Sequence, residues 1–348
     1  MYKRQNMGKD AMRMQRINDF VLKIFHYFAT YKYFRKDAFF KFLGTDGQWS
    51  ATCYASRRKL QELLEALKKV SFPERVELYK AMRADAVFQM HERDEAFVFQ
   101  ESRLNRELVQ TAAKLTSYLY DEIFVKSGFQ EDGTLFQYKE LKEQLCIAND
   151  RYLCPVCLNR YGSLKELGQI DHFFPKMKYP ALTFRPENLT LICMLCNEGT
   201  GKGVKNPMTG TNLTELYLPY VRGAEGEMEI VVQSDKEFGN VVKLLPGNSD
   251  PKTEKRIDND DRIFHLTARW NGQVDGSIES GMKDAREMNT TDEVKAFLKE
   301  KALTKRREAD RHPEMLVEAA CFEYLSSEGE KAFLKAWEQD RRDRAKML

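Results

Sequence analysis

Two Cys-x-x-Cys pairs constrain this sequence more than any other feature. Cys154 and Cys157 form the first pair, Cys193 and Cys196 form the second, and residues 158–192 lie between them. Two intervening residues let one tight turn direct both thiolates at the same ion, and two such turns complete a tetrahedral site. The sequence therefore predicts a four-cysteine zinc site, with free thiols or an iron–sulfur cluster as alternatives. Because four protein ligands leave no open coordination position, we expect this zinc to be structural.

The remaining cysteines do not indicate a disulfide framework. Cys53, Cys146 and Cys321 are isolated in the sequence, so we expect them to be buried or inert thiols. The 348-residue chain is 42% hydrophobic, which is enough for real cores. It contains no apolar run of about 18 residues, the length that a membrane-spanning helix needs. We therefore expect a soluble, cytoplasmic protein that does not contact membranes.

Net charge alone does not identify a partner. The chain carries 56 basic and 53 acidic side chains, for a net charge of +3. Attraction to nucleic acid would therefore depend on local clustering of basic residues. The basic runs at 305–307 and 341–342 are interrupted by acidic residues, and we interpret them as solvated helix faces.

Apolar periodicity predicts a chain made mostly of helices, with a few strands. The predicted helices lie within residues 10–43, 60–67, 101–125 and 135–146, after a capping box at Ser71, and across much of 257–346. The predicted strands cover residues 168–174, 189–192, 229–232 and 240–244. We expect the last two strands to form a hairpin.

The segment between the cysteine pairs carries a second chemical signal. Asp171 and His172 lie in the first predicted strand there, Asn188 precedes the second, and Asn197 directly follows the last cysteine, where a helix could begin. Strand, turn, strand and helix is the arrangement of a ββα-metal site. With these motifs in this order, residues 150–210 resemble the HNH endonuclease family in its four-cysteine zinc form.

The resemblance implies a metal-dependent endonuclease. It implies that His172 is the general base that activates water, and that Asp171 and Asn197 hold a catalytic Mg²⁺ or Mn²⁺ ion. It also implies that Asn188 bonds the loop backbone and keeps His172 oriented. These roles suit phosphodiester hydrolysis, because imidazole accepts a proton near neutral pH and a divalent cation stabilises charge on the leaving oxygen. Oxygen ligands favour magnesium or manganese over a second zinc.

Basic residues near these motifs are candidates for binding nucleic acid. Lys176, Lys178 and Arg185 follow the Asp-His pair, and a solvated basic loop is the alternative for all three. Lys202 is a fourth candidate, as a phosphate contact. It lies in the glycine-rich run 198–203, where each glycine costs a helix about 1 kcal/mol relative to alanine. This run therefore predicts a short or delayed helix.

We expect an α+β, predominantly helical protein in three parts. Residues 1–147 are predicted to form an N-terminal helical domain, residues 148–210 a small ββα-metal HNH core with its pair of zinc knuckles, and residues 211–348 the strand hairpin with a C-terminal helical region.

The expected function is hydrolysis of DNA, double-stranded in the first instance, by a one-metal HNH mechanism. Residues 262–270 resemble a helix of bacterial HNH proteins from anti-phage defence operons, which implies a role in antiviral defence. An RNA-cleaving nuclease and a catalytically inactive, zinc-stabilised binding module stay open as alternatives. Because unrestrained cleavage would harm the host, we also expect regulation by the helical regions or by a protein partner such as an operon-encoded ATPase. Oligomerisation is compatible with this interpretation.

Overall fold

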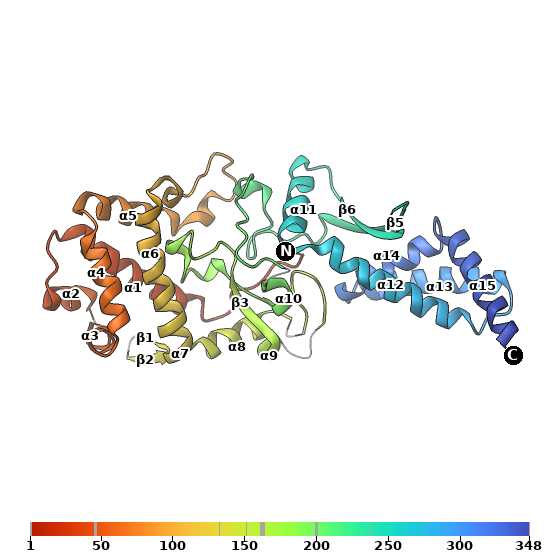
Figure 1. The fold of residues 1–348 in the computed structure, drawn as a ribbon, viewed down its shortest axis with the longest axis horizontal. Coiled ribbons are helices and arrows are strands. Elements are labelled where there is room, and N and C mark those ends of the chain that lie inside the picture. The colour runs from red at the N-terminus through yellow and green to blue at the C-terminus, as the bar shows by residue number, and fades with distance from the viewer. Residues whose placement is uncertain are drawn as a thin grey trace. The chain divides into compact units, whose positions relative to one another are not determined.

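The computed structural model describes residues 2–44, 47–131, 133–150, 152–160, 164–198, 201–237 and 239–347. Within these residues the fold is α+β and mostly helical, with small antiparallel sheets, which confirms the predicted class (Figure 1). Contacts between Cα atoms divide the chain into two compact units. One unit comprises Lys3–Pro155 and Tyr161–Gly223, and the other comprises Met1–Tyr2, Val156–Arg160 and Ala224–Leu348.

The unit that begins at Lys3 contains most of the N-terminal helices. Their bounds are α1 Ala11–Thr30, α2 Lys36–Leu43, α3 Gly47–Ser56, α4 Arg58–Lys69, α5 Phe72–Asp85, α6 Arg106–Tyr118, α7 Val125–Ser127 and α8 Tyr138–Ala148. Short helical turns connect them at η2 Phe88–His91, η3 Gln100–Arg103 and η4 Leu119–Phe124. The helix predicted within 10–43 is two helices, because the chain turns between them. The Tyr27 hydroxyl stabilises this turn by donating to Arg35 O and accepting from Arg35 N, both at 3.1 Å.

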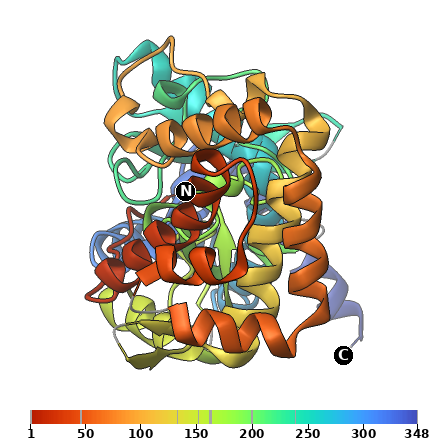
Figure 2. The same cartoon turned by 90° about the vertical axis from the view of Figure 1, so that its left-hand side faces the viewer.

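Two features that the sequence predicted are present in these helices: the buried apolar face of α4 and the capping box of α5. The Leu60 and Leu64 side chains of α4 are buried, and α4 packs along α6 as α1 packs along α5 (Figure 2). The predicted capping box starts α5: Ser71 Oγ accepts from Glu74 N at 3.4 Å, and a Glu74 carboxylate oxygen accepts from Ser71 N at 3.2 Å.

Two antiparallel strand pairs lie in the same unit. Strand β1 Phe129–Glu131 pairs with β2 Thr134–Phe136, a small hairpin that the sequence patterns missed. Strand β3 Gly168–His172 pairs with β4 Leu189–Cys193, at the two predicted positions. Their register places Gly168 opposite Cys193 and His172 opposite Leu189. The short elements around this pair are α9 Leu164–Leu167, η5 Pro180–Leu182, η6 Pro186–Asn188, α10 Met194–Asn197 and η7 Leu213–Glu215.

The sequence placed the possible start of a helix at Asn197, whereas the one-turn helix α10 Met194–Asn197 ends there. The next helical turn in the described residues is η7. Gly199 and Thr200, in the middle of the glycine-rich run, lie outside the described residues. The described residues of this run, 198 and 201–203, are not helical, in agreement with its low helix propensity.

One buried cluster contains residues of both the N-terminal helical segment and the segment after it. Phe88, Phe97 and Phe99 pack with residues that include Phe173, Phe174, Tyr179 and Leu182. The sequence placed residues 1–147 and 148–210 in separate domains, whereas Lys3–Pro155 and Tyr161–Gly223 lie together in one compact unit. The physical reason is this shared aromatic core, which neither segment forms alone.

The other unit contains the predicted strand hairpin and the C-terminal helices. Strand β5 Met228–Asp235 pairs antiparallel with β6 Gly239–Pro246, which confirms the hairpin. The helices are α11 Pro251–Phe264, α12 Leu266–Ala285, α13 Thr291–Ala309, α14 Leu316–Leu325 and α15 Glu330–Met347, with the turn η8 Pro313–Met315. Trp270 and Trp337 are buried here, and Trp337 Nε1 donates to Ala285 O at 2.8 Å. None of the described helices combines the length and the apolarity that a membrane crossing requires.

Candidate functional site

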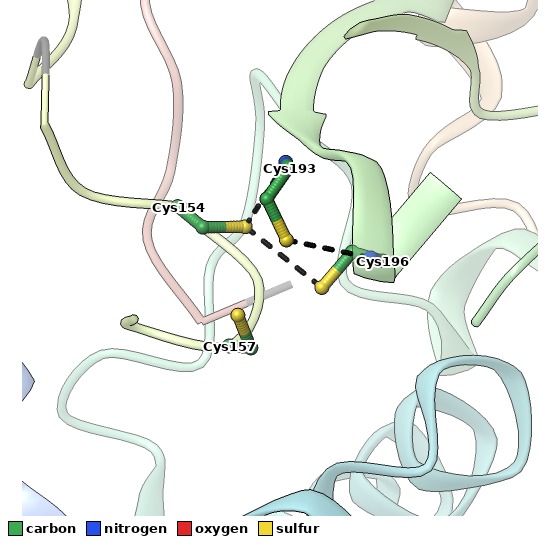
Figure 3. A group of neighbouring side chains, drawn as sticks. All are labelled: Cys154, Cys157, Cys193 and Cys196. Carbon is green, nitrogen blue, oxygen red and sulfur yellow. Dashed lines mark hydrogen bonds between the residues drawn. The ribbon is translucent and has the colours of Figure 1, made fainter. Parts of the chain in front are cut away.

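Four buried cysteine side chains converge, as Figure 3 shows. The Sγ atoms of Cys154, Cys157, Cys193 and Cys196 all lie within 4.8 Å of one another. Those of Cys154 and Cys196 are 3.8 Å apart, far longer than the roughly 2.05 Å of a disulfide. A tetrahedral zinc with Zn–S bonds of about 2.3 Å places its sulfurs about 3.8 Å apart. The cluster could therefore hold a metal ion such as zinc.

Strand β4 and helix α10 position the second cysteine pair. Cys193 ends the strand and Cys196 lies in the one-turn helix that follows. Backbone N–H groups point at the sulfurs: Cys196 N donates to Cys193 Sγ at 3.4 Å, and Cys193 N donates to Cys154 Sγ at 3.5 Å (Figure 3). Such donors favour the charged thiolate, which is the form that ligates a metal.

His172 lies at the end of β3 in a defined protonation state. Its Nε2 atom is 2.9 Å from Thr183 O. A carbonyl oxygen can only accept, so Nε2 carries the proton and Nδ1 keeps its lone pair. Burial lowers the pKa of His172 well below its ordinary value, and the nearby Lys176 ammonium lowers it further. Both effects favour the neutral imidazole, with Nδ1 as its unprotonated nitrogen. The centre of the ring lies 4.5 Å from that of the Tyr120 ring.

Asn188 bonds both ends of the loop that follows His172. Its Oδ1 accepts from Phe174 N at 2.6 Å. Its Nδ2 donates to Phe174 O and to Leu182 O, both at 3.0 Å. Asn188 is fully buried, so these bonds hold the loop at a fixed width and keep the turn that carries Thr183 close to the strand.

Asp171 forms a buried ion pair with Lys202. The Lys202 Nζ atom lies 3.0 Å from each Asp171 carboxylate oxygen and donates to Oδ1 and, at 2.7 Å, to His172 O. Among the described residues, Asp171 Oδ2 is buried and has no hydrogen-bond partner. Burial raises the pKa of Asp171, and the Lys202 ammonium partly opposes this rise. The sequence proposed Lys202 as a phosphate contact, whereas the structure places its ammonium against Asp171.

Asn197 forms a hydrogen bond with Gln169, which lies two residues before Asp171 on β3. Its Nδ2 atom donates to Gln169 Oε1. Gln169 and Asp171 are two residues apart on β3, so their side chains leave the same face of the strand. This bond engages the Asn197 amide nitrogen. Of the described residues, Lys202 and not Asn197 makes the direct contact with Asp171.

Asp171, His172 and Lys202 line an open cavity of about 590 Å³. Its described lining includes Asp171, His172, Lys176, Lys178 and Lys202, together with Glu101, Arg106 and Gln110 from the N-terminal helical segment. Asn197 is not among the described residues that line it.

The four basic residues singled out from the sequence lie in different environments. Lys178 is exposed at the cavity, whereas Lys176 Nζ pairs with Asp121 at 2.5 Å. Arg185 is buried away from the cavity, where it pairs with Glu187 at 2.7 Å and bonds Gln15. No local motif in the sequence marks Thr183, Tyr120, Glu101 or Arg106.

We expect Lys202→Met to lower the free energy of unfolding by about 3 kcal/mol, the order found when one partner of a buried ion pair is removed. The loss arises because the Asp171 carboxylate and the His172 carbonyl both keep their burial and lose their donor. Urea denaturation followed by circular dichroism measures it. The double variant Lys202→Met, Asp171→Asn should recover part of the lost free energy of unfolding. Lys178→Met, which removes an exposed lysine, should change the free energy of unfolding little. Equal stability of Lys202→Met and the wild type would contradict this account.

Comparisons with known proteins do not place the chain in a family: no protein-family model, no curated protein and no solved structure matches it.

Proposed function

We propose that this protein is a metal-dependent endonuclease of the HNH type, which hydrolyses phosphodiester bonds of double-stranded DNA with His172 as the general base. The observation that carries the proposal is the 2.9 Å contact between His172 Nε2 and Thr183 O. It leaves Nδ1 as the proton acceptor of a neutral imidazole, which is the form that deprotonates water near neutral pH. His172 lines a cavity whose lining also includes two acidic side chains, Asp171 and Glu101, and three lysines.

The residues around Asp171 fit a hard divalent cation. Asp171 Oδ2 is buried and lies 3.0 Å from Lys202 Nζ, but none of the described residues donates a hydrogen bond to it. Asn197, whose amide nitrogen bonds Gln169, would supply its carbonyl oxygen as a second ligand. Carboxylate and amide oxygens are ligands that Mg²⁺ and Mn²⁺ prefer. Lys202 would keep Oδ1 while the cation takes Oδ2. Bound there, such an ion supplies charge stabilisation for the phosphate and its leaving oxygen.

The four-cysteine cluster has a separate task in this proposal. We assign it a structural zinc, because four thiolates complete a tetrahedral shell and leave no position for water or substrate. The zinc would fasten both ends of residues 158–192, and strands β3 and β4 lie between those ends. The stability of the strand pair that presents His172 would thus depend on a metal that does not take part in hydrolysis.

Substrate binding in the cavity would rest mainly on its exposed basic residues. Lys178 is exposed, and Arg106, at the start of α6, is exposed on another part of the lining. Arg185, proposed from the sequence as a backbone contact, is engaged by Glu187 and Gln15 in the interior. We therefore propose Arg106, and no longer Arg185, as a candidate phosphate contact.

Arg106→Ala is expected to weaken DNA binding and to reduce the slope of log affinity against log salt concentration by about 1, the effect of losing one phosphate contact. Fluorescence anisotropy of a labelled duplex, recorded without divalent cation so that no cleavage occurs, measures this slope. Lys114→Ala is the matched control, because Lys114 is an exposed cation on the same helix that does not line the cavity. Identical slopes for the two variants would remove Arg106 from the binding site.

Plasmid cleavage in the presence of Mg²⁺ or Mn²⁺ tests the proposed function, by comparing the wild-type chain with His172→Ala. If the two chains cleave at the same rate, His172 is not the general base and the proposal fails.

A further inference from the structure

We propose that Glu101, from the N-terminal helical segment, is a positioning residue for His172. The role rests on the proposed nuclease function. Glu101 Oε1 accepts a hydrogen bond from Ala181 N at 3.0 Å. Ala181 lies in the turn η5, and Thr183, two residues later, accepts the hydrogen bond of His172 Nε2 at 2.9 Å. Glu101 thus holds the short turn whose carbonyl fixes the tautomer of the general base.

Asp85 fixes Glu101 in turn. It lies at the end of α5, where its Oδ1 accepts from Gln100 N at 2.7 Å and its Oδ2 accepts from Glu101 N at 2.8 Å. These two N–H groups begin the turn η3, so the Asp85 carboxylate satisfies donors that the turn itself leaves unpaired. Both acidic side chains are essentially inaccessible to solvent. The Glu101 carboxyl group therefore has little freedom to move away from Ala181.

Two further contacts connect the N-terminal helical segment to the same turn and ring. The hydroxyl oxygens of Thr116, in α6, and Thr183 are 3.1 Å apart. The Tyr120 and His172 rings meet edge-on, with their centres 4.5 Å apart. The helical segment is thus part of the support of the catalytic base, which gives it a role that its sequence did not reveal.

To hold the turn η5, Glu101 has to accept the hydrogen bond from Ala181 N. A neutral side chain with an accepting oxygen can do this as well as a charged carboxylate. Burial raises the pKa of Glu101 well above its ordinary value, and the neighbouring Asp85 carboxylate raises it further. Its second oxygen, Oε2, is buried without a hydrogen-bond partner among the described residues. Glutamine is therefore the closest neutral substitute, because it keeps the shape and the accepting oxygen. Methionine keeps most of the volume and removes the acceptor.

The experiment compares Glu101→Gln, Glu101→Met and Ser71→Ala in steady-state cleavage of a labelled duplex oligonucleotide. Glu101→Met should lower kcat about tenfold to a hundredfold with KM nearly unchanged, since misplacing a catalytic group by about 1 Å has an effect of this order. Glu101→Gln should retain the wild-type kcat. Ser71→Ala removes the cap of α5 and does not touch the turn η5, so it should destabilise the protein without lowering kcat. A wild-type kcat for Glu101→Met would overturn the proposal.

Nitrogen NMR of the His172 ring gives a readout that does not depend on activity. The wild type and Glu101→Gln should show a protonated Nε2 and an unprotonated Nδ1, and Glu101→Met should show a mixture of tautomers. An unchanged His172 spectrum in Glu101→Met would overturn the proposal even if cleavage had been lost. If no chain cleaves DNA, the proposed function fails, and the spectrum still decides whether Glu101 holds the turn.

A second variant covers the case in which Glu101→Met does not fold. Asp85→Asn keeps the size of the Asp85 side chain and replaces one of its two accepting oxygens with an NH₂ group, so one of the N–H groups of η3 loses its acceptor. The same fall in kcat and the same change in the His172 spectrum should appear, with smaller amplitude. A wild-type spectrum and a wild-type kcat for Asp85→Asn would then overturn the proposal.

Discussion

Cys154→Ala is expected to lose its bound zinc and to unfold around residues 154–202. Structural zinc contributes about 10–16 kcal/mol to small zinc-binding peptides near pH 7. That is as large as the roughly 5–15 kcal/mol that separates the folded from the unfolded state of a typical protein. Loss of one thiolate also leaves three buried thiols with no ion to share. Zinc content per chain, measured by mass spectrometry, and protease sensitivity of the segment measure the two effects.

Cys321→Ala is the matched control for this experiment. Cys321 is a buried cysteine outside the cluster, and burial raises the pKa of its thiol to about 12, which disfavours the thiolate form that ligates a metal. Its replacement should leave the zinc content unchanged and cost only the packing of one sulfur. A full complement of zinc in Cys154→Ala would show that the cluster is not the zinc site. Wild-type protein purified without zinc that still resists protease would refute a structural role for the metal.

His172→Ala should lower the rate of DNA cleavage by about 10²–10⁴-fold, the range that a general base contributes. Only the proton acceptor is removed, since Asp171 and Asn197 remain available for the cation. Conversion of supercoiled plasmid under single-turnover conditions measures the chemical step. His26→Ala is the control, because His26 is an exposed histidine that stacks on Tyr79 away from the cavity. Added imidazole should restore part of the activity of His172→Ala, and a failure of His26→Ala to cleave would point to a general effect of losing a histidine.

The same assay separates the two proposed metals. A chelator at moderate concentration should stop cleavage at once by removing the exchangeable cation, while the zinc held by four thiolates stays bound. Mg²⁺ or Mn²⁺ should then restore the rate, and Zn²⁺ should not. Cleavage that continues without any divalent cation would contradict a hydrolytic role for an ion at Asp171.

Local chemistry explains which features the sequence could predict. The strands at 168–174 and 189–192 and the hairpin at 229–232 and 240–244 follow from side-chain pattern and turn residues, which act over a few positions. The cap of α5 at Ser71 is a contact between residues three apart. The helix predicted within 10–43 is interrupted by a turn, which the Tyr27 hydroxyl stabilises through its two bonds to the Arg35 backbone. Apolar periodicity cannot register such a bond.

The basic residues illustrate the limit of sequence reasoning at the site. The sequence alone does not distinguish the four basic residues Lys176, Lys178, Arg185 and Lys202. In the structure, only Lys178 of these four is exposed at the cavity. Arg185 and Lys202 have carboxylate partners in the interior, at Glu187 and Asp171. The partner of a charged side chain is set by the path of the whole chain. Arg106, which no motif marks, lines the cavity for the same reason.

By itself, the sequence determined the cysteine cluster and the place of Asp171 and His172 at the end of a strand. Spacing within a turn and alternation within a strand depend on neighbouring residues alone. Only the tertiary structure decided how His172 is held. Thr183 is 11 residues from His172, and Ala181 is 80 residues from Glu101. Contacts over such separations arise when helices of the N-terminal segment pack into one aromatic core with the strand pair, and no local pattern encodes them.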